Sequence, residues 1–285
     1  MQHLKGYFGK LLLTDIVERD ISKYQAQRQA EKAAGKTINN EVATLRAILR
    51  RHRLWASIAP DVRMLKTRED VGRAISAEEE SRLLSTCAAS RSRSLFPAVV
   101  IALNTGLRLE ELRLLKWRQI DFVNEALMVG KSKTPQGTGR PVPLNKRAYD
   151  ALTAWAHQFA ERKPEHYVFP SEKVGVAGNN QIVSVFDTDP KKPMGSWKVS
   201  WTTAREQSGV SCRFHDLRHT TVTRLLERGV AFAVVATIMG WSAATSVRMA
   251  KRYGHIGQSF QRDAMKLLDA KESGTALVGE HTTIQ

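Results

Sequence analysis

The sequence is poor in cysteine and has no long apolar run, and both scarcities exclude whole classes of protein. Its two cysteines, Cys87 and Cys212, lie far apart without a CxxC or Cys/His cluster, so we expect two buried thiols and neither a disulfide framework nor a zinc site. No segment approaches the roughly 18 to 20 consecutive apolar residues that span a bilayer. The first residues, MQHLKGYFGKLLLTD, lack a small-residue cleavage site. We therefore expect a globular, cytoplasmic protein with no membrane partner.

Positive charge, in contrast, is abundant. Lysine and arginine number 44 against 28 aspartate and glutamate residues, a formal net charge of +16. This excess favours a polyanionic partner, with nucleic acid as the first choice. An anionic membrane surface would also attract the charge, but it would need a basic amphipathic or lipidated segment, and none is convincing. A merely solvated cationic surface is the other alternative.

Residues 1–68 read as a small helical domain. Thr14 can cap a helix over residues 15–32, with Gly35 marking its end. A second helix is expected over residues 37–55, because apolar residues recur there at helical spacing: Ile38, Val42, Leu45, Ile48 and Leu49. Its other face carries a basic stripe of Arg46, Arg50, Arg51 and Arg53. The stripe either follows DNA phosphates or is a solvated charged face.

A polar, charged stretch interrupts the helical pattern after this domain, and we place a linker at residues 69–75. A new helix opens at Ser76, where Glu79 three residues later completes a capping-box signature. We expect a second domain over residues 76–270. Residues 271–285 lack strong periodicity and are expected to form a loose tail.

The second domain is expected to be mainly helical with one small sheet. Residues 95–106 and 109–117 read as buried helices. Residues 120–130 and 140–144 read as neighbouring strands joined by a Gly-containing turn. Everything from Lys146 onward is expected to be helical. The fold class is therefore mainly α with a small antiparallel β-sheet (α+β).

Five pieces of the sequence stand in an order that carries chemistry. They are TGLRLEEL with Arg108, GKSKT with Lys133, HDLRH with His215 and Arg218, GW with Trp241, and KRYGHI with Tyr253. From about Ser76 to about His255 they closely resemble the tyrosine recombinase (phage integrase) family. HxxR alone is a weak signal, but all five pieces in order are a strong one. The resemblance implies a helical core-binding (SAM-like) DNA-binding domain followed by a catalytic domain.

The arginines are the residue type that this chemistry needs. Cleaving a phosphodiester without metal requires fixed cations for the developing negative charge, and guanidinium groups match phosphate oxygens in geometry. Arg108 and Arg218 fit this task, and Arg108 would also lie beside helix N-terminal donors that favour an anion. The alternative for Arg108 is a surface salt bridge with Glu111. By resemblance, Glu111 instead buttresses the arginine pair.

Tyr253 is the expected nucleophile, because a phenolic oxygen can attack phosphorus and preserve the bond energy in a phosphotyrosine linkage. Its phenol would be largely protonated at neutral pH, so it needs nearby cations and a base. His215 lies three residues before Arg218 on one helical face and, when neutral, can accept that proton. The alternatives are an ordinary half-buried tyrosine and a histidine that is only a satisfied polar group.

The leaving 5′ oxygen needs a proton, which a lysine on a flexible hairpin can deliver. By resemblance the catalytic lysine belongs in the turn between the two expected strands. Lys133 is the favoured residue, but Lys131 lies two residues away. The register of a hairpin is not fixed by sequence, so both stay open.

Three features depart from the common family pattern. Trp241 stands where many relatives have a second histidine, although some carry tryptophan; its indole can donate a hydrogen bond to phosphate, with core packing as the alternative. The interval between Trp241 and Tyr253 is somewhat longer than usual, which weakens the placement of the tyrosine. Only two clear helices precede the linker, where the family usually has about four; the alternatives are a truncated N-terminus, a late start site and a naturally reduced clamp.

The resemblance implies cleavage and rejoining of double-stranded DNA at a specific recombination site through a 3′-phosphotyrosine, without metal, ATP or other cofactor. A phage or integrative mobile element is the expected source, and the bacterial nucleoid the expected location. Four protomers would surround two duplexes in the synaptic complex, and a host DNA-bending protein or a directionality factor are candidate partners. A helix expected over residues 258–271 either docks on a neighbour or covers its own domain.

Two other functions stay open. One is a catalytically reduced DNA-binding accessory protein, which the intact set of candidate residues argues against. The other is a topoisomerase IB-like relaxing enzyme, which shares the chemistry but needs no second DNA site.

Overall fold

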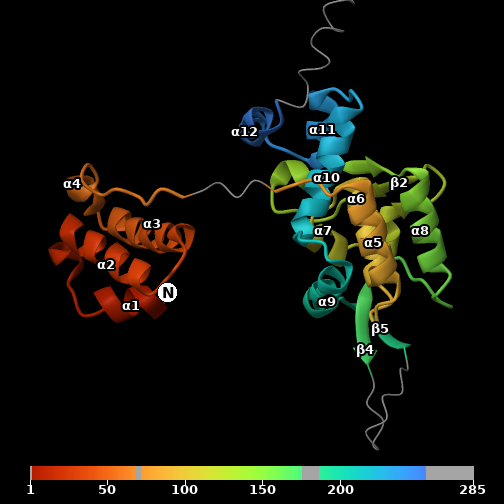
Figure 1. Ribbon diagram of the computed structural model, residues 1–285, viewed down its shortest axis with the longest axis horizontal. Helices are drawn as coiled ribbons and strands as arrows, with labels where there is room; N and C mark the ends of the chain where they lie inside the picture. The colour runs from red at the N-terminus through yellow and green to blue at the C-terminus, as the bar shows by residue number, and fades with distance from the viewer. Residues whose placement is uncertain (1, 68–71, 175–185, 255–285) are drawn as a thin grey trace, which may run out of the picture. The chain divides into compact units, whose positions relative to one another are not determined.

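The computed structural model describes residues 2–67, 72–174 and 186–254. The chain divides into two compact units, with the boundary between Val71 and Gly72 (Figure 1). Each unit has its own hydrophobic core. The expected helix over residues 258–271, the expected tail and part of the expected linker lie outside the described residues. Among the described helices, none has both the length and the apolarity to cross a membrane.

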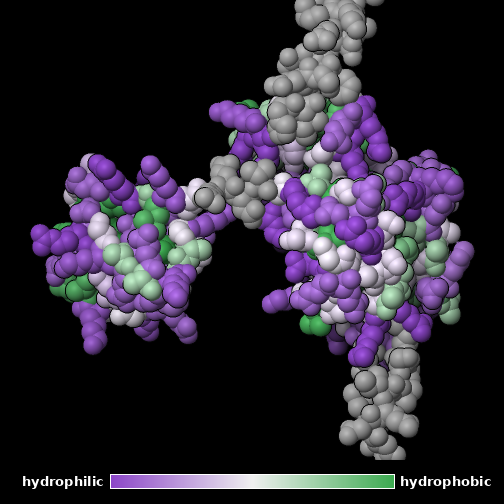
Figure 2. All heavy atoms as spheres, viewed as in Figure 1, coloured by the Kyte–Doolittle hydropathy of each residue, from purple (hydrophilic) through white to green (hydrophobic). Residues whose placement is uncertain are grey.

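The first unit contains four described helices: α1 (Gln2–Phe8), α2 (Glu18–Ala30), α3 (Gly35–Arg51) and α4 (Trp55–Ile58). The sequence predicted only the two long ones. α1 and α4 have seven and four residues, too few turns for a helical period to be visible. Hydrophilic residues cover much of the visible face of this unit (Figure 2).

The predicted ends of α2 are also wrong. Thr14 lies in a short 3₁₀ turn, Leu13–Asp15, and α2 begins only at Glu18. The carboxylate of Asp20 accepts a hydrogen bond from the amide of Val17 at 3.1 Å, which satisfies a free N-terminal donor that Thr14 was expected to satisfy. Gly35 does not end α2 but begins α3.

The two long helices of this unit are joined by a buried charged group as well as by apolar contacts. The guanidinium of Arg28 on α2 donates to both carboxylate oxygens of Glu41 on α3 at 3.1 Å. The hydroxyl of Tyr24, which is 1% exposed, donates to the same carboxylate at 2.9 Å. The pairing fixes the two helices side by side because breaking it would leave a buried charge uncompensated.

The second unit holds the remaining elements, eight helices and five strands among its described residues. The helices are α5 (Ala77–Ala88), α6 (Leu95–Thr105), α7 (Leu109–Arg113), α8 (Lys146–Ala156), α9 (Lys198–Ser208), α10 (Phe214–Glu227), α11 (Phe232–Met239) and α12 (Ala243–Tyr253). The strands are β1 (Ile120–Asp121), β2 (Ala126–Met128), β3 (Pro141–Pro143), β4 (Pro170–Val174) and β5 (Phe186–Pro193). The mainly helical fold class with small antiparallel sheets is confirmed.

Helix α6 is the centre of the second unit, since it is apolar on every side and packs against α5, α8 and α10 (Figure 1). It ends at Gly106, which adopts the left-handed conformation with φ of 65°. This positive φ favours glycine, and a Cβ here would also lie 2.6 Å from the terminal methyl of Met239. The tight ending brings the carbonyl of Gly106 next to the end of α11.

The capping box at Ser76 is confirmed: its hydroxyl accepts from the amide of Glu79 at 3.2 Å, and the Glu79 carboxylate accepts from the amide of Ser76 at 3.0 Å. The helix predicted over residues 109–117 is shorter than expected. It stops at Arg113, because the backbone that follows pairs with another segment: the carbonyl of Leu115 accepts a hydrogen bond from the amide of Val168 at 2.8 Å.

The predicted strand over residues 120–130 is two strands. Asp121 ends the first one, since its carboxylate accepts from the amides of Val123 and Asn124 at 3.0 and 2.9 Å and so fixes a turn. The second strand, β2, pairs antiparallel with β3, and Leu127 lies opposite Val142. The sheet order is β1-β2-β3, and the lysine-bearing loop joins β2 to β3.

The prediction of helix throughout the chain after Lys146 is wrong, because β4 and β5 form an antiparallel pair. Their sequences, PSEKV and FDTDPKKP, have no alternation of apolar and polar residues. The period of two by which strands are detected is therefore absent from both sequences.

Candidate active site

Two arginines of the second unit converge on one buried carboxylate. Glu111, on α7, pairs with Arg108 at 2.7 Å and with Arg140 at 2.8 Å. Arg108 is the residue just before α7, and its amide also donates to the Glu111 carboxylate at 3.0 Å. Arg140 comes immediately before β3. The cluster therefore joins the helix after α6 to the base of the hairpin.

The Arg108–Glu111 pair is present, but it is not an exposed surface pair, because the Glu111 side chain is only 2% exposed. Burial alone would raise the pKa of Glu111. Hydrogen bonds from Arg140 and Ser132 and from the amide of Arg108 outweigh burial and lower that pKa to about 2. The carboxylate is thus ionised, and it holds two guanidinium groups in place.

Arg218 of α10 is anchored differently. It is buried, and its two terminal nitrogens donate to the carbonyls of Gly106 and Met239 at 2.6 and 2.5 Å. Among the described residues it has no carboxylate at salt-bridge distance. Burial lowers the pKa of Arg218 to about 9, with a further lowering by the charge of Arg108. A buried cation held only by carbonyl dipoles favours an added anion.

Tyr253, the last residue of α12, is 7% exposed. Its hydroxyl is hydrogen-bonded to Nδ1 of His219, one turn after His215 on α10. Burial raises the pKa of Tyr253 to about 12, against the opposing effect of the charges of Arg252 and Arg218. The phenol is therefore protonated at neutral pH, as the sequence predicted, and lies within the electrostatic reach of Arg218.

His215, expected to accept the tyrosine proton, lies on the exposed side of α10. Its ring meets the ring of His219 at a centroid distance of 5.1 Å and an angle of 87°. Desolvation and the charge of Arg218 lower the pKa of His215, so it is neutral at neutral pH. The structure places His219, not His215, against the hydroxyl of Tyr253.

Trp241 contacts both the apolar cluster of the second unit and the candidate nucleophile. Its ring stacks on Tyr253 at a centroid distance of 6.4 Å and an angle of 11°, and it contacts Phe232 at 5.7 Å. The packing role is therefore present, since the residue packs against the apolar cluster around Met239, and Trp241 is half-buried. Its hydrogen bond to phosphate stays a prediction.

Lys131 and Lys133 are exposed on the loop between β2 and β3. Ser132 between them is fixed: its hydroxyl donates to Glu111 at 2.6 Å and accepts from Arg108 at 3.2 Å. The loop is also held at Gly137, whose carbonyl accepts from Arg140 at 2.7 Å. The loop is therefore anchored to the arginine cluster while both lysine side chains stay outside it.

The sequence interpretation did not single out Arg140, Ser132 or His219. Two of them had a usable signal. His219 lies four residues after His215, so the two share one helical face, and Arg140 is the basic residue immediately before β3, whose central residue Val142 is buried. Ser132 had none, because its role depends on a contact with Glu111, 21 residues away in sequence.

The expected arginine stripe of the first unit is not one face of a helix. Arg46 is half-buried on α3. Arg50 and Arg51 are exposed in its last turn, and Arg53 follows the helix with a left-handed φ of 61°. The reason is that α3 ends at Arg51, four residues before the predicted end.

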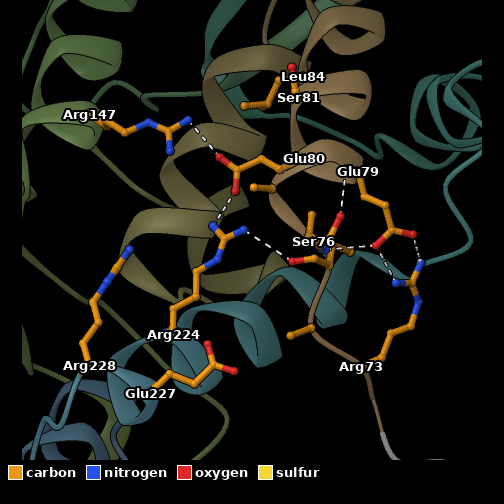
Figure 3. Close-up of a pocket in the computed structure, with 13 residues that line it drawn as sticks. Arg73, Ser76, Glu79, Glu80, Ser81, Leu84, Arg147, Arg224, Glu227 and Arg228 are labelled. Carbon is orange, nitrogen blue, oxygen red and sulfur yellow. Dashed lines mark hydrogen bonds and ion pairs between the residues drawn. The ribbon is translucent and has the colours of Figure 1, made fainter.

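A cavity of about 920 Å³ lies elsewhere in the second unit, lined by residues of α5, α8 and α10 (Figure 3). Glu80, only 7% exposed in its side chain, pairs there with Arg147 at 2.8 Å and with Arg224. Arg73 pairs with Glu79 at 2.6 Å. These ion pairs connect three helices, and the cavity contains none of the residues in the candidate site.

The comparisons with known proteins agree with this geometry. The model of the phage integrase family matches residues 73–259. The chain is 25% identical over 262 residues to an integrase of Salmonella phage P22, covering 90% of this chain and 64% of that protein. It is 27% identical to a shufflon-specific DNA recombinase of Escherichia coli, covering 89% and 65%. The chain thus spans a little under two thirds of these two relatives.

Two solved structures share the fold. One is the Tn1549 transposon integrase, residues 82–397, in complex with circular intermediate DNA: the TM-score is 0.67 at 21% identity, covering 88% of this chain and 85% of that one. The other is a lambda integrase (75–356) dimer bound to a COC′ core site, with a TM-score of 0.63 at 21% identity and coverage of 88% and 84%.

Proposed function

The chain belongs to the phage integrase family, and from this premise we propose that it is a site-specific recombinase that cleaves and rejoins double-stranded DNA through a 3′-phosphotyrosine at Tyr253. Metal and ATP are not required, because the energy of the broken phosphodiester is kept in the phosphotyrosine bond. An integrase of a phage or an integrative mobile element is the form of the activity that we favour.

One observation carries the proposal: the buried guanidinium of Arg218 has no carboxylate at salt-bridge distance among the described residues, and the next residue of α10, His219, is hydrogen-bonded to the Tyr253 hydroxyl. A scissile phosphate would supply the missing anion. Arg108, fixed by Glu111, would hold a second phosphate oxygen, because the hydrogen bonds of its guanidinium within the described chain run through Nη1 only. Two such cations stabilise the charge that develops on phosphorus.

The remaining candidate residues take subsidiary roles. Trp241 would donate its indole N–H to the phosphate while its ring packs on Tyr253. Lys133, or Lys131, would protonate the leaving 5′ oxygen once DNA orders the loop. His215, neutral and exposed on the same helix as Arg218, would hydrogen-bond the phosphate or exchange the tyrosine proton.

Domain roles follow the same proposal. Residues 1–68 would form a DNA-contacting domain, residues 69–75 a linker, residues 76–270 the catalytic domain and residues 271–285 a tail. The basic residues at the end of α3 would add phosphate contacts: Arg46, Arg50, Arg51 and Arg53. Strand exchange would need a homotetramer on two duplexes. A host DNA-bending protein or a directionality factor would complete the assembly.

The test is a covalent trap. A tiled set of nicked duplexes covering the DNA on both sides of the coding region is incubated with the protein and then denatured in SDS. We expect an adduct with a restricted subset of the duplexes, none with Tyr253→Phe, and no effect of EDTA. DNA binding without any adduct would overturn the proposal in favour of an accessory protein. Relaxation of plasmids irrespective of sequence would overturn it in favour of a topoisomerase-like enzyme.

A further inference from the structure

The hydroxyl and the ring face of Tyr253 are held by two different residues. Nδ1 of His219 hydrogen-bonds the hydroxyl, and Trp241 stacks on the ring. His219 and Tyr253 are each 7% exposed. Because His219 lies on α10 and Tyr253 ends α12, this hydrogen bond is a direct polar connection between the helix carrying Arg218 and the helix carrying the tyrosine.

The opposite edge of the His219 ring packs against the chain where it enters the second unit. A Cβ built on Gly72 would lie 2.2 Å from Cδ2 of His219, 2.6 Å from its Nε2 and 2.6 Å from a carboxylate oxygen of Asp216. Contacts this short do not occur between real atoms, so a side chain at position 72 requires the His219 ring, the Asp216 carboxylate or the chain at position 72 to move. The ring has little freedom to move, since it is buried and bonded to Tyr253.

We propose that His219 is the positioning residue for the Tyr253 hydroxyl, and that Gly72 sets the position of His219 by leaving room for its ring. The inference rests on the proposed function, because it concerns the same nucleophile. It connects the first residue of the catalytic unit to the reacting oxygen through a single side chain.

The protonation of His219 is compatible with this role. Burial lowers the pKa of His219 to about 4, with a further lowering by His215. The ring is therefore neutral at neutral pH, and a neutral imidazole has one accepting nitrogen. When the phenol donates to Nδ1, a lone pair of its oxygen can be directed at phosphorus.

Two substitutions at position 219 separate the hydrogen bond from the bulk of the ring. In His219→Asn, the side-chain amide can lie where Nδ1 lies and keep the hydrogen bond to Tyr253. In His219→Gln, the longer side chain places its amide where Nε2 lies, so this hydrogen bond is lost. His219→Ala removes both. Gly72→Ala tests the contact from the other side, and Gly195→Ala is its matched control, since nothing lies within 4 Å of a Cβ at Gly195.

The first measurement needs no DNA. The rate at which N-acetylimidazole acetylates Tyr253 is followed by mass spectrometry of its tryptic peptide in the full-length protein. Losing one hydrogen bond should raise the rate roughly tenfold in His219→Ala, His219→Gln and Gly72→Ala. His219→Asn and Gly195→Ala should stay near the wild-type rate. Equal rates in all variants would overturn the proposal.

The second measurement is the rate of SDS-resistant adduct formation at saturating DNA. We expect about a tenfold decrease in His219→Ala and Gly72→Ala, recovery in His219→Asn, and DNA affinity unchanged throughout. Wild-type adduct rates in His219→Ala and Gly72→Ala would overturn the positioning role. If the wild type itself forms no adduct, the proposed function fails, and the acetylation rates still decide whether His219 holds Tyr253.

The reactivity of the two buried thiols shows whether a variant is slow because it is unfolded or because the Tyr253 hydroxyl is no longer positioned. Cys87 and Cys212 are buried in the second unit, at 1% and 4% exposure, and a folded variant should keep both unreactive toward a disulfide reagent. If His219→Ala has reactive thiols, Gly72→Ala takes its place in the comparison. If Gly72→Ala has reactive thiols, His219→Ala takes its place. Loss of adduct only in variants with reactive thiols would overturn the inference.

Discussion

The arginine cluster and the lysine loop belong to the same unit but are constructed in opposite ways. Arg108, Arg140 and Arg218 are all fixed by hydrogen bonds to a buried carboxylate or to carbonyls at helix ends. Lys131 and Lys133 are exposed and lie on either side of Ser132, which is fixed by its hydrogen bond to Glu111. The difference suggests a division of labour. Under the proposed function, the arginines that stabilise the charge on phosphorus would be held in place before DNA binds, whereas the lysine would reach its proton-donating position only with DNA bound.

Arg218→Ala should show the largest effect, because it removes the preorganised cation. We expect adduct formation to slow by about a thousandfold, while DNA affinity falls far less, since removal of one aligned donor costs about 10² to 10³ in rate. Arg113→Ala is the matched control: Arg113 also donates to a carbonyl, that of Met194 at 2.7 Å, but lies outside the candidate site. Rates of the two variants within threefold of each other would remove Arg218 from the mechanism.

Lys133→Ala should show a smaller effect, about a hundredfold slower cleavage, in the usual range for loss of a general acid. A duplex with a 5′-bridging sulfur, whose leaving group needs no proton, should restore the rate. Lys131→Ala is the control on the same loop and should cleave both duplexes normally. If only Lys131→Ala is slow and rescued by sulfur, the general acid is Lys131 instead.

Glu111→Gln should alter stability more than it alters DNA affinity. The pKa of the carboxyl falls from 4.5 to about 2 on folding, so its ion pairs stabilise the fold fully above about pH 4.5 and lose that effect as the pH falls toward 2. The shift corresponds to roughly 3 kcal/mol at neutral pH.

We therefore expect Glu111→Gln to lower the free energy of unfolding by about 3 kcal/mol at pH 7, as measured by urea titration of tryptophan fluorescence. The difference from wild type should shrink as the pH approaches 2. Glu110→Gln is the neighbouring control, because Glu110 is 64% exposed in its side chain and should change stability by less than about 1 kcal/mol. Equal losses in both variants would show that the buried carboxylate is not special.

The sequence predicted the residues whose chemistry allows few substitutes, and it predicted the long amphipathic helices. The family, the mainly helical fold and the helices around Leu45, Leu103 and Arg218 followed from motif order and periodicity. Helices α1 and α4 and the strands β4 and β5 did not, because short or polar elements carry no periodic signal. The contacts of Ser132, Arg140 and His219 also did not, because they join residues far apart along the chain.

The most direct test of the central claim is to identify the residue that carries the DNA. The trapped adduct is digested with nuclease and trypsin, and the peptide with the residual nucleotide is sequenced by mass spectrometry. The account predicts the peptide YGHIGQSFQR, modified on Tyr253. A nucleotide on a peptide containing Tyr149 or Tyr167, or on a serine, would contradict it.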